Sequence, residues 1–180
     1  MSSDQANRNL AEALRRVALT TLVRNASDDC TIVEASRSAQ EELLGSRLLV
    51  ITISSFTFRL LTIFQVSEAQ PTREYYTSGL TARSLDEAFA EIANMCCGAL
   101  GRELSAQFKH LAMSIPYGLE SQCARFLDEL QPRFRASYDV TINNAARVRI
   151  TLCLCCNRPV EFAAARLAEE DHARGELELF

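Results

Sequence analysis

Glu91 and Asn94 are the two residues of this sequence whose types and spacing best suit a chemical role. Residues three apart project side by side from a helix, so a carboxylate and an amide would form one polar pair. The amide stays neutral and offers both a donor and an acceptor. Such a pair could hold a partner or orient a water molecule, although two solvated side chains on an ordinary amphipathic helix would produce the same pattern.

Residues 84–104 are predicted to form the helix that positions this pair. Ser84 and Glu87 have the spacing of a capping box, in which each side chain satisfies a backbone donor at the helix start. Apolar residues then recur along one face, at Leu85, Phe89, Ile92, Cys96 and Leu100. At about 100° per residue, the opposite face carries Glu87, Ala90, Glu91, Asn94, Gly98 and Gly101.

Gly98 and Gly101 are unusual inside a helix, where each costs about 1 kcal/mol relative to Ala. We therefore expect a compensating feature, and close approach of another backbone is the usual one. Small residues around a carboxylate and an amide also leave a surface onto which something bulky could dock.

Residues 86–98, with the sequence DEAFAEIANMCCG, resemble the signature helix of the CheC/CheX/FliY phosphatases. That pattern has an acidic residue or Ser, then E-x-x-N, then a Pro a little over twenty residues further on. The matching residues are Glu87, Glu91, Asn94 and Pro116, with Met95, Gly98 and Gly118 as further similarities. The chain departs from the pattern in having Glu87 where Asp or Ser is commoner and residues 120–130 as an apparent insertion. Its single E-x-x-N resembles CheX rather than two-site CheC proteins.

The resemblance implies a phosphatase that hydrolyses the aspartyl phosphate of a CheY-like response regulator. Asn94 would orient the attacking water and Glu91 would anchor the regulator through its active-site lysine, while Glu87, Ala90, Gly98 and Gly101 would belong to the docking surface. The chain itself would bind no cofactor, because Mg²⁺ is expected on the regulator. A homodimer is also implied. The alternative is a non-catalytic docking or dimerisation module of the same fold, in signalling or flagellar assembly.

The elements around this helix can be predicted from periodicity and turn residues. A helix is expected at residues 9–25, a short strand at 30–35, a polar connection at 37–45 and a hairpin of strands at 47–54 and 56–66. A loop that could include a helical turn follows at 67–83, and a strand at 105–114 is expected to stop at Pro116. A short helix at 120–130 precedes a last hairpin, 134–142 and 147–154, which turns at Asn143 and Asn144.

These elements predict an α+β fold with a largely antiparallel sheet packed against two long helices. Residues 1–157 would form a single CheX-like domain with its N-terminal helix, and 158–180 a C-terminal helix and acidic tail. In the last strand, Val148 and Ile150 are expected to face one side of the sheet and Arg149 and Thr151 the other.

Composition excludes several classes of function. The formal net charge of −4 and pI near 5.3 provide no basic surface for nucleic acid. The polar N-terminus is unlike a signal peptide, and the apolar runs are too short to cross a bilayer. We therefore expect a cytoplasmic protein without membrane insertion.

Seven cysteines without a secretory signal are expected to be reduced thiols. Cys96 should face the core and Cys97 the helix flank. The spacing of Cys153, Cys155 and Cys156 is a poor match to zinc-ligand pairs, so no metal site is expected. A cysteine nucleophile would need His110 or His172 as its base, and a redox- or metal-sensing protein is a third hypothesis.

Overall fold

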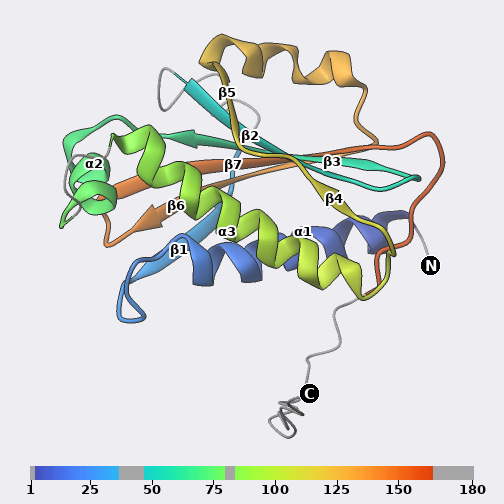
Figure 1. Ribbon diagram of the computed structural model, residues 1–180, viewed down its shortest axis with the longest axis horizontal. Coiled ribbons are helices and arrows are strands. Elements are labelled where there is room, and N and C mark those ends of the chain that lie inside the picture. The colour runs from blue at the N-terminus through green and yellow to red at the C-terminus, as the bar shows by residue number, and fades with distance from the viewer. Residues whose placement is uncertain (1–2, 37–46, 80–83, 164–180) are drawn as a thin grey trace, which may run out of the picture.

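The computed structural model describes residues 3–36, 47–79 and 84–163. Four helices and seven strands lie in these ranges (Figure 1). The helices are α1 (Ser3–Thr21), α2 (Gln70–Thr77), α3 (Leu85–Ser105) and the 3₁₀ helix η2 (Ser121–Leu130). The strands are β1 (Cys30–Glu34), β2 (Arg47–Ser54), β3 (Arg59–Val66), β4 (Ala112–Met113), β5 (Tyr117–Glu120), β6 (Phe134–Ile142) and β7 (Ala146–Cys155).

The strands form one sheet in the order β1-β6-β7-β3-β2-β4, with β5 also paired to β2, and each of these described pairings is antiparallel. Both predicted hairpins are present. The β6–β7 connection is Asn143, Asn144 and Ala145, and the φ angles of Asn143 (51°) and Asn144 (55°) are positive, a left-handed conformation that Asn tolerates. The predicted α+β class with a large antiparallel sheet is confirmed.

The two faces of the sheet are covered differently (Figure 1). α1 and α3 lie on one face, where alternate residues of β7, including Val148 and Ile150, join the main core. η2 lies on the other face, and its Leu127 packs with Val50, Ile63 and Cys153. The predicted alternation along the last strand is therefore present, and both sides of it are buried.

The described chain has more helices than the two long ones expected to cover the sheet: besides α1 and α3 it contains the shorter α2 and η2. α2 occupies part of the predicted 67–83 loop. Pro71 lies in its first turn, where the missing N–H of proline costs no helical hydrogen bond. η2 falls where a short helix was expected, and it ends at Gln131 with a φ of 45°.

α3 matches its prediction closely. Ser84 accepts a hydrogen bond from the backbone of Glu87, and the Glu87 carboxylate accepts one from the backbone of Ser84, so the capping box is complete. Four of the five predicted core residues, Leu85, Phe89, Cys96 and Leu100, are buried, and Ile92 is half-buried.

The predicted strand at 105–114 was largely wrong. Buried Leu104 secures the last turn of α3, and the backbone N–H groups of Gln107 and Phe108 donate to its carbonyl. Only Ala112 and Met113 pair as a strand, before Pro116. A proline donates no ladder hydrogen bond, and pairing with β2 resumes beyond it in β5.

At the N-terminus α1 begins at Ser3 and ends at Thr21, earlier at both ends than expected. At the other end of the described chain, residues 159–163 are not helical. Phe162 is instead buried against the rings of Phe58 and Phe108. The rest of the predicted C-terminal helix and acidic tail, and the 37–45 connection, lie outside the described residues. No helix in the described ranges is long and apolar enough to span a bilayer.

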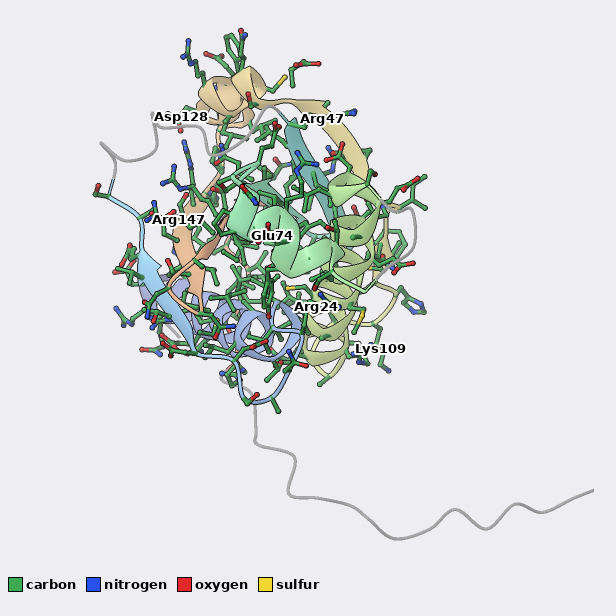
Figure 2. The ribbon with its side chains drawn as sticks, turned by 90° about the vertical axis from the view of Figure 1, so that its left-hand side faces the viewer. Arg24, Arg47, Glu74, Lys109, Asp128 and Arg147 are labelled. Carbon is green, nitrogen blue, oxygen red and sulfur yellow. The ribbon has the colours of Figure 1, made fainter. Side chains whose placement is uncertain are left out.

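Figure 2 shows the end of the molecule where α2 faces the viewer. Asp28 connects α2, the β6–β7 turn and the segment after α1. Its carboxylate accepts hydrogen bonds from the Tyr75 hydroxyl on α2 (2.6 Å), the Asn143 amide of the β6–β7 turn (2.9 Å) and the Asn25 backbone (2.9 Å). These bonds, that of Asn143 foremost, lower the pKa of Asp28 to about 2. Arg24 closes the same region by donating to the Ser78 hydroxyl (2.7 Å).

We expect Asp28→Asn to lower the unfolding midpoint at pH 7, because the charged acceptor for Asn143 and Tyr75 is lost. Since the folded-state pKa is depressed, the stabilisation is present in full above pH 4 and lost as the pH falls towards 2. Urea unfolding of wild type and variant at pH 7, 4 and 3 measures this, with Asp29→Asn as the neighbouring control. A difference that stays constant down to pH 3 would contradict the assignment.

Candidate functional site

The outward face of α3 forms a ridge, which we define by Glu87, Glu91, Asn94, Gly98 and Arg102. α1 packs along one side of this helix, and the sheet lies beneath it (Figure 1). The opposite side of α3 is anchored by buried residues along its whole length. The ridge is therefore a rigid platform whose side chains project from a fixed backbone.

Glu91 and Asn94 are both exposed on this ridge, side by side as their spacing predicts. Within the described part of the chain the Asn94 amide makes no hydrogen bond, so its N–H donors and its carbonyl acceptor all face solvent. The structure thus presents a carboxylate and an unoccupied amide about 5–6 Å apart at their Cβ atoms.

Glu87 has a structural task besides its predicted docking role. Its carboxylate accepts the Ser84 backbone hydrogen bond (3.0 Å) at the start of α3. This contact holds Glu87 at the N-terminal end of the ridge. Ala90 and Gly101 are half-buried at the border of the ridge.

The two glycines do not owe their presence to close packing within this chain, contrary to the expectation from sequence. A Cβ atom at Gly98 would lie 3.7 Å from Nη1 of Arg102, and one at Gly101 would lie 3.9 Å from Cδ1 of Ile53. Both are ordinary van der Waals distances to side chains rather than to another backbone. The Gly101 position points towards Ile53 of β2, whereas Gly98, which is also half-buried, lies on the ridge beneath the Arg102 side chain.

Gly118 lies beside a longer side chain. A Cβ atom there would lie 2.9 Å from Nη2 of Arg47, so the exposed guanidinium would have to shift to admit one. Arg47 in turn reaches Asp86 in the first turn of α3, at 3.6 Å between Nη1 and Oδ2. Arg47, Asp86 and Gly118 line part of a pocket of about 160 Å³ beneath this end of α3. β5 is thereby connected to α3 at the N-terminal end of the ridge.

Sequence reasoning missed several exposed residues near the predicted site. Met95, adjacent to Asn94, is 61% exposed, and Arg102 continues the ridge one turn beyond Gly98. The positions of both residues on the helix, counted at about 100° per residue from Asn94, could have identified them. The edge segment 112–120, which follows α3 and pairs with β2, also exposes large apolar side chains: Met113, Ile115, Tyr117 and Leu119. They occupy every second position of the segment, so a period-two pattern could have identified them.

The cysteines are unpaired, and Cys96, Cys97 and Cys153 are buried. Cys97 was expected on the flank but faces the core, because the buried sector of α3 is wider than a single stripe. Burial raises the pKa of Cys96 to about 11 and that of Cys97 further, which keeps both thiols protonated and poorly nucleophilic. These residues pack as small hydrophobic side chains.

His110 lies in the loop after α3, with a φ of 62°, rather than in the expected strand. His172 falls outside the described residues. Among the side chains that the structure does describe, no group of three or more His, Cys, Asp or Glu residues is arranged to hold a metal ion.

No family model matches the sequence, and no curated protein matches it significantly. Solved structures do match. CheX of Vibrio vulnificus has a TM-score of 0.52 at 13% identity, covering 81% of this chain and 96% of its own. The CheX–CheY–BeF₃–Mg²⁺ complex of Borrelia burgdorferi includes a match with a TM-score of 0.55 at 9% identity, covering 83% and 97%. The FliM middle domain of Vibrio alginolyticus has a TM-score of 0.50 at 6% identity, covering 84% and 92%.

These matches extend over nearly the whole length of each solved chain, so they concern the complete domain rather than a shared hairpin or helix. The chain therefore has a fold of the CheC/CheX/FliY type, as the resemblance of residues 86–98 implied. At such low identity the likeness defines the fold alone, and activity has to be argued from the ridge.

Proposed function

We propose that this protein is a phosphatase that hydrolyses the aspartyl phosphate of a CheY-like response regulator. The single observation that carries the proposal is the exposed pair on α3, Glu91 and Asn94, at the positions where the family pattern has its catalytic carboxylate and amide. A chain in the CheX–CheY complex of Borrelia burgdorferi matches the fold of this protein, which supports a CheY-like regulator as the partner.

The reaction needs little from the phosphatase beyond positioning. In the regulator, Mg²⁺ and a lysine would already hold the phosphoryl oxygens and neutralise charge in the transition state. The oxygen of a water molecule attacks phosphorus, and the bond to the aspartate oxygen breaks with its electron pair going to that carboxylate. Inorganic phosphate leaves, and the regulator regains a free aspartate.

Asn94 suits the task of orienting this water. Its carbonyl can accept a hydrogen bond from the water while its N–H groups donate to a phosphoryl oxygen, and a neutral amide does not repel the anionic group. Orientation of this kind can lower a barrier by several kcal/mol. Glu91, one helical turn away, would pair with the regulator's lysine and set the register of docking.

Several further features belong to the proposal. The chain would bind no cofactor of its own, since Mg²⁺ belongs to the regulator, and both proteins would meet in the cytoplasm. A homodimer would be formed through sheet edges, for which the exposed strands β1 and β4 are available at the two ends of the strand order.

The test is turnover. A CheY-like regulator is phosphorylated with a small-molecule phosphodonor, the donor is removed, and loss of phosphate is followed with and without this protein at one-twentieth of the regulator concentration. An accelerated loss that scales with protein concentration and exceeds one phosphate per molecule supports the proposal. A loss equal to the regulator's own rate, for every regulator of the host, overturns it.

A second candidate function is a docking module without turnover. The match to the FliM middle domain favours it, because this fold is also present in that protein. The two candidates differ in one measurement: a docking module would bind a regulator without shortening the lifetime of its phosphate.

Gly98, on the ridge between Asn94 and Arg102, provides a test of docking that is separate from chemistry. Gly98→Ala should stabilise α3 by about 1 kcal/mol, since alanine is the better helix former, and should weaken regulator binding because a methyl group rises from the ridge. Gly101→Ala should give a similar gain in stability with a smaller loss of binding, as its methyl would point towards Ile53. Urea unfolding and titration with the regulator measure the two effects. Equal binding by both variants would argue against docking over Gly98.

A further inference from the structure

We propose that Arg102 is a cationic contact of the same site and that it meets the regulator's anionic phosphoryl pocket beside Asn94. This inference rests on the proposed function and adds a residue to it. The observation behind it is the position of the Arg102 guanidinium, whose Nη1 lies 3.7 Å from where a Cβ of residue 98 would be.

The direction of this side chain follows from helix geometry. Side chains of a helix lean towards its N-terminus and cover the preceding turn. Arg102 therefore lies back over Gly98, and its charged end is carried one turn closer to Asn94. A rise of 1.5 Å per residue places the Gly98 turn roughly 6 Å along the axis from Asn94 and roughly 10 Å from Glu91.

The guanidinium is available for a partner. Arg102 is exposed, and within the described residues its side chain forms no ion pair or hydrogen bond. Other arginines of the protein do have acidic partners: Arg16 pairs with Glu103 at 2.8 Å and Arg149 with Asp139 at 2.7 Å. Glycine at position 98 gives the Arg102 side chain a flat surface to lie on, which is a physical reason for a glycine that is costly in a helix.

The charge of the side chains therefore changes from negative to positive along the ridge. A carboxylate (Glu91) comes first, a neutral amide (Asn94) follows, and a cation (Arg102) comes last. A complementary partner would present a cation opposite Glu91 and an anion opposite Asn94 and Arg102. A phosphorylated aspartate pocket with its lysine has these two charges next to each other, so the ridge fits it in only one orientation.

Arginine suits the anionic end because its planar guanidinium can donate two hydrogen bonds to a phosphoryl group. A cation in the last turn of a helix also interacts favourably with the helix dipole, which would give Arg102 a purely structural role. The variant Arg102→Lys separates the two roles. It keeps the charge at the helix end but loses the paired donors.

The experiment compares wild type, Arg102→Ala, Arg102→Lys and the control Arg73→Ala, which removes an exposed arginine from α2. Two quantities are measured at 50 and 300 mM salt: kcat/KM for dephosphorylation, and affinity for a regulator loaded with beryllofluoride and Mg²⁺. We expect Arg102→Ala to lower both at least tenfold at low salt and to reduce their salt dependence, Arg102→Lys to recover part of the loss, and Arg73→Ala to match wild type.

The outcomes separate this inference from the proposed function. If wild type binds the regulator without turnover, the proposed phosphatase activity is rejected, while a tenfold weaker affinity of Arg102→Ala would still support the Arg102 contact. If Arg102→Ala stays within twofold of wild type in both quantities, the Arg102 contact is rejected and the phosphatase proposal is unaffected. If the loss in Arg102→Ala matches a fall in its unfolding free energy and Arg102→Lys restores it in full, Arg102 acts on the helix dipole and the contact is likewise rejected.

Discussion

Asn94→Ala is expected to lower the rate of regulator dephosphorylation by at least about 100-fold while leaving binding nearly unchanged. A misplaced reacting group costs about this much when catalysis depends on orientation, and alanine offers no polar atom to place the water. The amide makes no hydrogen bond to the described part of the chain, so its removal should not disturb α3. Single-turnover decay of the phosphorylated regulator with excess variant measures the chemical step directly.

Asn157→Ala is a suitable control, because it removes an exposed amide from the segment after β7. Asn94→Asp offers a second comparison, since it keeps the shape but places a negative charge against the phosphoryl group and should be as slow as alanine. Equal decay rates for wild type and Asn94→Ala would refute the catalytic assignment, whatever the binding result.

Glu91→Ala is expected to reduce both binding and turnover. A carboxylate–lysine contact in a closed interface is worth about 2–5 kcal/mol when one partner is truncated, which corresponds to a loss of roughly 30- to several thousand-fold in affinity. Calorimetric or fluorescence titration with the beryllofluoride-loaded regulator measures this loss. At saturating regulator, part of the rate should return, because Asn94 is still present.

The matched control is Glu129→Ala, which removes an exposed carboxylate from η2 on the other face of the sheet. If the two glutamate variants bind equally well, α3 is not the docking element. A Glu91→Ala variant with normal affinity but no turnover would instead exchange the roles assigned to the carboxylate and the amide.

Local features of the fold were predictable from sequence because they depend on residues close together in the chain. The capping box at Ser84 and Glu87, the core stripe of α3 and the Asn143–Asn144 turn all follow from spacing and conformational preference. The exposure of Glu91 and Asn94 on one face of a helix followed from the same periodicity, and the resemblance of residues 86–98 supplied a chemical meaning for that pair.

Other features required the tertiary structure. Residues 105–114 were expected to form a strand, yet buried Leu104 holds the end of α3, its carbonyl accepts from the backbone of Gln107 and Phe108, and only Ala112 and Met113 pair. Phe162 reads as part of a charged tail, but contact with Phe58 and Phe108 buries it. Secondary-structure propensity predicts neither effect, because both depend on contacts between residues far apart in the chain.

The sequence by itself determined which residues can share a helix face and which turns can form, because these follow from bond geometry over a few neighbouring positions. Only the tertiary structure decided which distant segments cover the buried face of α3, that Arg47 of β2 lies beside Gly118 of β5, and that the guanidinium of Arg102 lies over Gly98. Those outcomes depend on how distant segments pack and on which of several allowed rotamers a long side chain adopts, and neither is encoded in local spacing.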